Sequence, residues 1–230
     1  MDPEQLRLLP LWYVVFLLSV TFHEAGHAFA AYRGGDRTAY LGGQVSLNPW
    51  PHMLREPFGT ILVPLLSYVY VGWMMGWASA PYDPYWEQRH PRRAAWMAAA
   101  GPAANLLLAA VGFALLRFGL AQGLWTRALV DHGLDRLVVP LAGGSGLEAL
   151  APFASILLGL NVALFVFNLL PVPPMDGASV LAGLFAPARR ARDMLRAHPL
   201  GGLVGLLVAW YLFPGVFRWV FTPVRAWLYS

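Results

Sequence analysis

The sequence predicts an all-α polytopic membrane protein with about four transmembrane helices, a re-entrant segment and a short β-hairpin-like element. The first observation is composition: of 230 residues, 58% are hydrophobic and only 12% are charged, about half the charged fraction of a soluble domain. The second is that several apolar runs reach the ~20 residues needed to cross a bilayer. The third is that the basic residues are all arginine and lie between these runs. Arginines in that position set orientation rather than bind nucleic acid.

Four apolar segments have the length of a spanning helix, roughly Pro10–Tyr32, Ala94–Phe118, Pro152–Leu170 and Leu200–Phe221. A fifth run, Phe58–Ala80, is long enough to span, but Pro64, Gly72 and Gly76 interrupt it. Such breaks occur in spanning helices and also mark re-entrant segments that are buried within protein.

The longest polar connection between these runs is Gly119–Leu150. The piece "GGQVSLNPWP" (42–51) predicts a short extended strand closed by a turn, and Gly177–Phe185 predicts a short helix ahead of the basic segment "PARRARDMLRAHP" (187–199). No stretch is long enough for a separate soluble domain. We therefore expect one domain over residues 1–230, with a core of about 10–185 and an additional C-terminal transmembrane helix at about 200–221.

The N-terminal apolar run has an alternative interpretation as a signal peptide. "LWYVVFLLSV" (11–20) followed by "AFA" (28–30) resembles the apolar region and cleavage site of one. The preceding residues, however, include Asp2 and Glu4 against the single Arg7, which is not the expected basic flank. We therefore favour a retained transmembrane helix.

The first run ends in "TFHEAGHAF" (21–29), which contains an H-E-x-x-H motif. On a helix its histidines, His23 and His27, project from one face and are able to grip a single Zn²⁺. Glu24 would then act as general base on the attacking water and return the proton to the leaving amine. Gly26 leaves room for the close approach of another backbone. The alternative is an interfacial patch in which these side chains merely pair with one another.

A catalytic zinc ion usually has three protein ligands, and the chain has no cysteine to provide one. The best third ligand is Asp176, in the turn "FNLLPVPPMDGASVL" (167–181), where three prolines break the preceding helix. We expect Gly177 to permit a strained backbone just after the aspartate. As an alternative, Asp176 caps the short helix that follows.

Three motifs, "HEAGH" (23–27), "AGPAANLLLA" (100–109) and "NLLPVPPMDG" (168–177), together resemble those of the site-2 protease family of intramembrane zinc metalloproteases. The flanking "VSLNPWPH", "GTILVPLL" and "GWASAPYDP" are similar to its compact prokaryotic members without a PDZ domain. The resemblance implies one zinc ion held by His23, His27 and Asp176, with Glu24 as the catalytic residue.

The resemblance also assigns supporting residues and a setting. It implies that Asn168 orients substrate or stabilises the oxyanion, and that Gly101, Pro102 and Asn105 form a helix start used for packing. Met175 departs from the family pattern, in which leucine is commoner before Asp-Gly. The expected activity is cleavage of transmembrane segments of other membrane proteins, in a prokaryotic cell membrane and without nucleic acid.

A shared zinc site constrains the topology. If Phe58–Ala80 is re-entrant, the ends that carry His27 and Asp176 fall on one side of the membrane, together with ten of the sixteen arginines. If it spans, the arginines divide eight against eight. The positive-inside bias favours the re-entrant topology. We therefore expect both termini outside and the zinc toward the cytoplasmic face.

Substrate binding and two rival functions complete the predictions. A transmembrane substrate has to unwind because helical amides are already bonded, and "GGQVSLNP" with the re-entrant element offers a strand edge for β-addition. One rival is a metal transporter, which would need ionisable residues along the other helices. The second is a non-proteolytic binder of transmembrane helices, which would need no general base at Glu24. The oligomeric state is not determined by the sequence.

Overall fold

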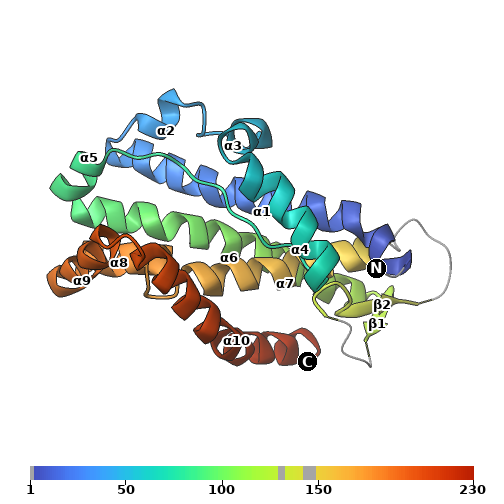
Figure 1. Cartoon of the computed structure of the whole chain (residues 1–230). Helices are drawn as coiled ribbons and strands as arrows, with labels where there is room; N and C mark the ends of the chain where they lie inside the picture. Colours follow the sequence, from blue (N-terminus) through green and yellow to red (C-terminus); the bar gives the residue numbers. More distant parts are fainter. Residues whose placement is uncertain (1–2, 129–132, 142–148) are drawn as a thin grey trace.

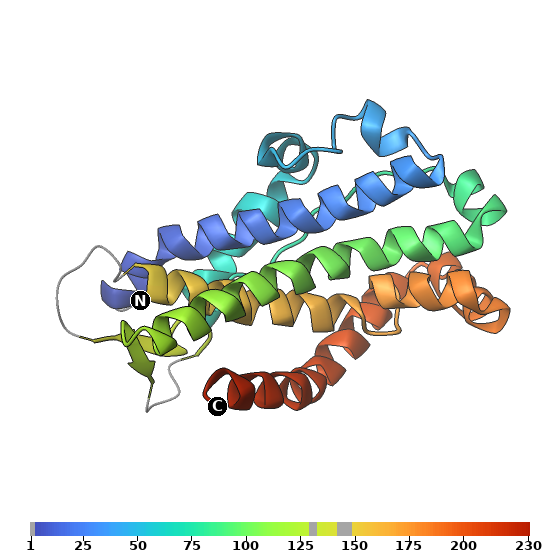
Figure 2. The same ribbon diagram turned by 180° about the vertical axis from the view of Figure 1, so that it is seen from behind.

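The computed structural model describes residues 3–128, 133–141 and 149–230. Among these residues, four helices are long and apolar enough to cross a membrane: α1 (Pro3–Gly34), α6 (Pro91–Ala121), α7 (Leu150–Asn168) and α10 (Gly201–Leu228). α1, α6 and α7 lie side by side, and α10 runs along one side of them (Figures 1 and 2). The predicted all-α polytopic fold is confirmed, and each predicted span coincides with most of one of these helices.

Small residues bring three of these helices into close contact. A Cβ added at Gly26 would lie 2.8 Å from the carbonyl oxygen of Ala100, which explains the close approach of α1 to α6. A Cβ at Gly112 would lie 2.7 Å from the backbone nitrogen of Leu158 on α7. Close backbone approach at small residues is how membrane helices associate, since lipid offers no hydrophobic drive between them. α1, α6 and α7 therefore form a tightly packed unit with α6 in the middle.

The segment that connects α1 to α6 in the sequence runs along the bundle and then turns back. A turn of π-helix, η1 (Phe58–Leu62), continues into α4 (Val63–Val71), which ends at Gly72 with φ +83°. The chain then returns in extended form to α5 (Pro84–Arg89), beside the end of α1 (Figure 1). On the way Trp77 N donates to Gly59 O at 3.1 Å. The run Phe58–Ala80 therefore turns back at Gly72 instead of continuing as one helix, the shape expected of a re-entrant segment.

The short β element is present but lies elsewhere than predicted. β1 (Trp125–Arg127) and β2 (Val138–Pro140) form an antiparallel pair in the connection between α6 and α7. Residues 42–48 instead form turns and bends between α2 (Thr38–Leu41) and α3 (Pro49–Arg55), so the strand predicted in "GGQVSLNPWP" is wrong. Asn48 caps α3 by accepting a hydrogen bond from Trp50 N at 3.0 Å. Turn chemistry therefore outweighs the two apolar residues of this segment.

The predicted short helix is α8 (Asp176–Leu184), and the basic segment forms a further helix, α9 (Ala186–Ala197). α9 is tied to α5 because the largely buried Arg192 pairs with Glu87. α5, α8 and α9 gather at the end of the bundle where α1 finishes, opposite both chain termini (Figure 1). The turn with Asp176 therefore lies at the same end as the two histidines.

Candidate metal centre

Three of the predicted site residues converge at this end of the bundle. His23 and His27 lie one turn apart on α1, and Asp176 is the first residue of α8. The Nε2 atoms of the two histidines are 3.0 Å apart. Asp176 Oδ2 lies 3.1 Å from His23 Nε2 and 3.3 Å from His27 Nε2. Three potential ligand atoms from distant parts of the chain thus face one point.

The other ring nitrogen of each histidine already has a partner. His23 Nδ1 lies 2.6 Å from Asn105 Oδ1, and His27 Nδ1 lies 2.7 Å from Met97 O. Both partners are oxygens that only accept, so each Nδ1 donates its proton to them and each Nε2 faces the cluster. Such second contacts orient metal-binding histidines.

The carboxylate and the spacing complete the fit to a cation. Burial alone would raise the pKa of Asp176, but the adjacent imidazoles outweigh it and hold that pKa well below its ordinary value. The side chain is therefore a carboxylate, and its buried Oδ2 has no hydrogen-bond partner among the described residues. Nitrogen and oxygen ligands about 2.0–2.1 Å from a tetrahedral ion lie about 3.3 Å from one another. The cluster therefore fits a zinc-sized ion.

The motif "AGPAAN" on α6 makes space for this cluster. A Cβ at Gly101 would lie 2.3 Å from His27 Nε2 and 2.7 Å from His23 Nε2, so only glycine leaves room for both rings. Asn105 donates through Nδ2 to Ser19 O on α1 and to Asn161 Oδ1 on α7. The predicted packing role is confirmed, since Asn105 bonds to neighbouring helices, and its contact with His23 adds a second role. The predicted helix start is wrong, because Gly101, Pro102 and Asn105 lie inside α6, which begins at Pro91.

Two further residues of this network were not predicted from the sequence. Asn161 Nδ2 donates to Ser19 Oγ at 2.9 Å, and Ser19 Oγ donates to Val15 O at 2.7 Å. Ser19, Asn105 and Asn161 are all fully buried. Their signal in the sequence is an isolated polar residue within an apolar span, which has to find a polar partner in an adjacent helix.

The turn before α8 differs from the prediction in two respects. Gly177 is not among the glycines with positive φ, so the expected strained backbone is wrong. Its small size matters instead, because a Cβ there would lie 2.2 Å from Leu169 O at the end of α7. The alternative of a helix cap also fails: α8 has no side-chain cap, and Asp176 faces the two histidines.

A cavity of about 400 Å³ opens over the cluster. His23, Glu24, His27 and Asp176 line it, together with Asn168 and the extended segment 77–82. Glu24 is 6% exposed and faces the same space as the cluster. Asn168 donates one amide hydrogen to Leu164 O at 3.0 Å. Every residue predicted for the site therefore borders this cavity.

Arg196 stands at the mouth of the cavity. Its guanidinium donates to Ser179 Oγ of α8 at 3.0 Å and to the hydroxyl of Tyr82 at 3.4 Å. Arg196 of α9 therefore connects α8 to the extended segment 77–82, and both of these line the cavity.

Comparison with known proteins identifies the family. The sequence matches peptidase family M50 over residues 11–212. It is 35% identical over 204 residues to YwhC of Bacillus subtilis, named as a candidate zinc metalloprotease, with 88% of this chain and 81% of YwhC covered. It is 30% identical over 212 residues to Rip2 of Mycolicibacterium smegmatis, named in the same way, with 91% of this chain and 69% of Rip2 covered. No solved structure matches. The chain therefore belongs to peptidase family M50, the site-2 protease family of membrane metalloproteases.

Proposed function

We propose that this protein is a zinc-dependent intramembrane endopeptidase that cleaves transmembrane segments of other membrane proteins. The observation that carries the proposal is the meeting of His23, His27 and Asp176 within 3.0–3.3 Å, beside Glu24 in one cavity. The family membership supports the peptidase activity. The position of the cluster, among helices of spanning length, supports a substrate that lies in the membrane.

The roles follow from the geometry. His23, His27 and Asp176 would hold one zinc ion, which supplies a Lewis acid for the scissile carbonyl and lowers the pKa of the attacking water. Glu24 takes the proton from that water and delivers it to the leaving amine. Asn168 has a second amide hydrogen, which we assign to the substrate carbonyl as its oxyanion forms.

The extended segment 77–81 is suited to hold an unwound substrate. It lines the cavity, and within the described chain Ala78 and Ala80 make no backbone hydrogen bond. Gln44, which does not line the cavity, holds this segment by donating to Ser79 O at 3.2 Å. An unwound segment is able to add here as a strand, with main-chain bonds giving affinity. The return limb of the re-entrant element, rather than "GGQVSLNP", would therefore supply the edge.

A photocrosslinking amino acid tests this edge. Placed at Ala78, it is expected to capture a model transmembrane substrate in the Glu24→Gln background. Placed at Leu47, which is 58% exposed and outside the cavity, it is expected to capture none. Capture at Leu47 alone would refute the assignment.

Glu24→Gln tests the function itself. The substitution keeps the size of the side chain but removes the base, so cleavage is expected to fall by about 10²–10⁴-fold. Zinc content measured on the purified protein should not change. Glu4→Gln, at the other end of α1, is the matched control and should cleave normally. Full cleavage by Glu24→Gln would exclude this residue as the base and favour a transport or binding function.

We further infer that the protein lies in a prokaryotic cell membrane with the cluster toward the cytoplasm. Because the chain has no cysteine, single cysteines at Leu47, Tyr85 and Val139 can be labelled in cells with an impermeant reagent. Leu47 and Tyr85 are expected to be protected, and Val139 to be labelled from outside. Labelling of Leu47 and Tyr85 from opposite sides would overturn the re-entrant topology in the membrane.

A further inference from the structure

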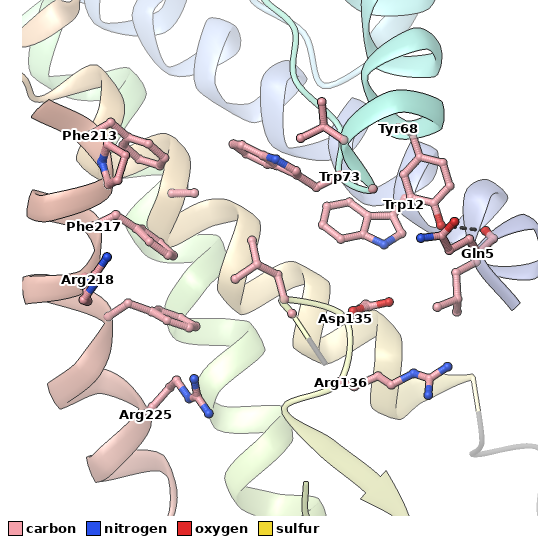
Figure 3. Close-up of a pocket in the computed structure, with 18 of the residues that line it drawn as sticks. Gln5, Trp12, Tyr68, Trp73, Asp135, Arg136, Phe213, Phe217, Arg218 and Arg225 are labelled. Carbon is pink, nitrogen blue, oxygen red and sulfur yellow. Dashed lines mark hydrogen bonds between the residues drawn. The ribbon is translucent and has the colours of Figure 1, made fainter. Parts of the chain in front are cut away.

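A second cavity, of about 750 Å³, lies between α10 and the N-terminal part of α1 (Figure 3). Its walls include Trp12 of α1, Tyr68 of α4 and Phe217 of α10. Trp12 and His23 are eleven positions apart on α1, which corresponds to roughly 16 Å along the helix axis. The two cavities share no lining residue, so this cavity is separate from the metal centre.

Aromatic rings form one wall of the second cavity. Phe213 and Phe217 lie 5.4 Å apart between ring centroids, and Trp73 stacks on Phe213 at 6.5 Å. Trp12 and Tyr68 lie 6.0 Å apart on the opposite wall, where the Tyr68 hydroxyl donates to Gln5 O at 2.7 Å (Figure 3). These surfaces suit a hydrocarbon chain rather than a fully polar ligand.

The other end of the cavity is basic. Arg218 and Arg225 project from α10, and Arg136 lies near Asp135 before β2 (Figure 3). Arg218 makes no hydrogen bond or ion pair with any residue that the structure describes. An arginine within a spanning helix is costly without an anionic partner, so the position of Arg218 favours an anion.

A buried donor on the cavity wall also lacks an acceptor. Trp12 is 1% exposed, and its Nε1 has no hydrogen-bond partner among the described residues. Its nitrogen lies on the side of the ring that faces Asp135 and Arg136 (Figure 3). A buried donor that makes no hydrogen bond destabilises the folded chain. A ligand oxygen near the basic end would relieve this cost.

The packing of α10 indicates how a ligand would enter. Only 17% of the apolar window of α10 is buried, and α10 bends midway, where Pro214 interrupts it (Figures 1 and 2). Proline inside a helix removes a backbone bond and bends the helix. Beyond the bend α10 packs on the bundle again, where Phe221 and Leu228 are buried, so the bend at Pro214 is where a ligand would enter.

We propose that this cavity binds one anionic phospholipid, with its phosphate at the arginines and an acyl chain along the aromatic wall. A basic pocket between transmembrane helices is a known way of holding such head groups. The lipid, rather than a free phosphate, is the occupant because six aromatic side chains line the cavity and a free phosphate would leave them without a partner. Bound there, it connects the second half of α10 to α1 and α4 and stabilises the bundle.

The test uses the full chain, delipidated in neutral detergent, and measures its unfolding temperature against added ligand. Phosphatidylglycerol is expected to raise the unfolding temperature in a saturable way. Phosphatidylcholine and water-soluble glycerol 3-phosphate are expected to leave it unchanged. Arg218→Gln should weaken the phosphatidylglycerol response by about 10-fold, since it removes a charge-assisted hydrogen bond. Arg92→Gln, an exposed arginine outside the cavity, is the matched control and should respond as the unmodified chain does.

Two further arms keep the proposal testable if Arg218→Gln does not fold. Trp12→Phe retains the ring but not the N–H, and should weaken the response several-fold. Photoactivatable phosphatidylglycerol should crosslink the unmodified chain within 213–218 rather than within α9. An equal response in Arg218→Gln and the unmodified chain, an equal loss in Arg92→Gln, or crosslinks confined to α9 would overturn the site. Saturable stabilisation by glycerol 3-phosphate as large as that by phosphatidylglycerol would overturn the lipid as its occupant.

Discussion

α7 and α10 are both apolar helices of spanning length, yet they are held in very different ways. In α7, 67% of the apolar window is buried, against 17% in α10. α7 packs backbone to backbone at Gly112 and joins the polar network of the metal centre through Asn161. α10 contacts the turn before α8 at Gly205, where a Cβ would overlap Pro173 O, and packs on α6 near its C-terminus, where Arg117 donates to Leu228 O, but most of its length is exposed. Hydropathy alone therefore does not separate a helix of the catalytic unit from a peripheral one.

The comparison is sharpest at glycines, because the same substitution meets very different surroundings. Gly101→Ala should have the largest effect, since the new Cβ would lie 2.3 Å from His27 Nε2. We expect metal affinity to fall by at least ~100-fold through displacement of both imidazoles. Competition with a chromogenic chelator measures it. Gly202→Ala, at the start of α10 with nothing within 4 Å, is the control. Unchanged affinity in Gly101→Ala would break the account of the α6 motif.

The buried network gives the next largest effect. Asn105→Leu removes the acceptor for His23 Nδ1, so metal affinity should fall by about 10–100-fold. Asn161→Ala acts only through Asn105 and Ser19 and should cost less. Leu106→Ala, on the exposed side of α6, controls for the loss of helix packing. If Asn105→Leu and Leu106→Ala bind metal alike, Asn105 serves packing alone.

Packing between helices gives a smaller effect. Gly112→Ala would place a Cβ 2.7 Å from Leu158 N, and such overpacking costs about 1–3 kcal/mol of unfolding free energy. The metal affinity of this variant should change little, because the clash lies away from the cluster. Unfolding in mixed micelles measures the cost. Stability equal to that of the unmodified chain would mean that α6 and α7 are not in close contact.

Gly215→Ala should have the smallest effect. No atom lies within 4 Å of the added Cβ, and alanine is favoured over glycine in a helix by about 0.5–1 kcal/mol. The unfolding temperature should therefore stay the same or rise slightly. A clear loss of stability would show that the second half of α10 is packed more tightly than described, and the contrast with α7 would then fail.

The spans and the ligand residues were predictable because run length and residue type are read directly from the sequence. Apolar runs of sufficient length identified α1, α6, α7 and α10, and two histidines that lacked a third ligand pointed to Asp176. The position of the β pair was not predictable, because a strand depends on a partner that local patterns do not identify. Asn161 was missed because its role depends on Ser19, 142 positions away. The role of Gly177 was predicted wrongly because a glycine is required both at a positive φ and at a crowded position, and the sequence does not distinguish the two.

The account rests on one metal ion shared by α1 and α8, and the zinc content of the purified chain tests it most directly. Elemental analysis after dialysis should find about one zinc ion per chain, since the cluster offers three ligands of the usual kind. Asp176→Ala should lower this to a small fraction, whereas Asp193→Ala, a carboxylate on α9 outside the cluster, should retain it. Full zinc content in Asp176→Ala, or an equal loss in Asp193→Ala, would contradict the assignment of Asp176 as the third ligand.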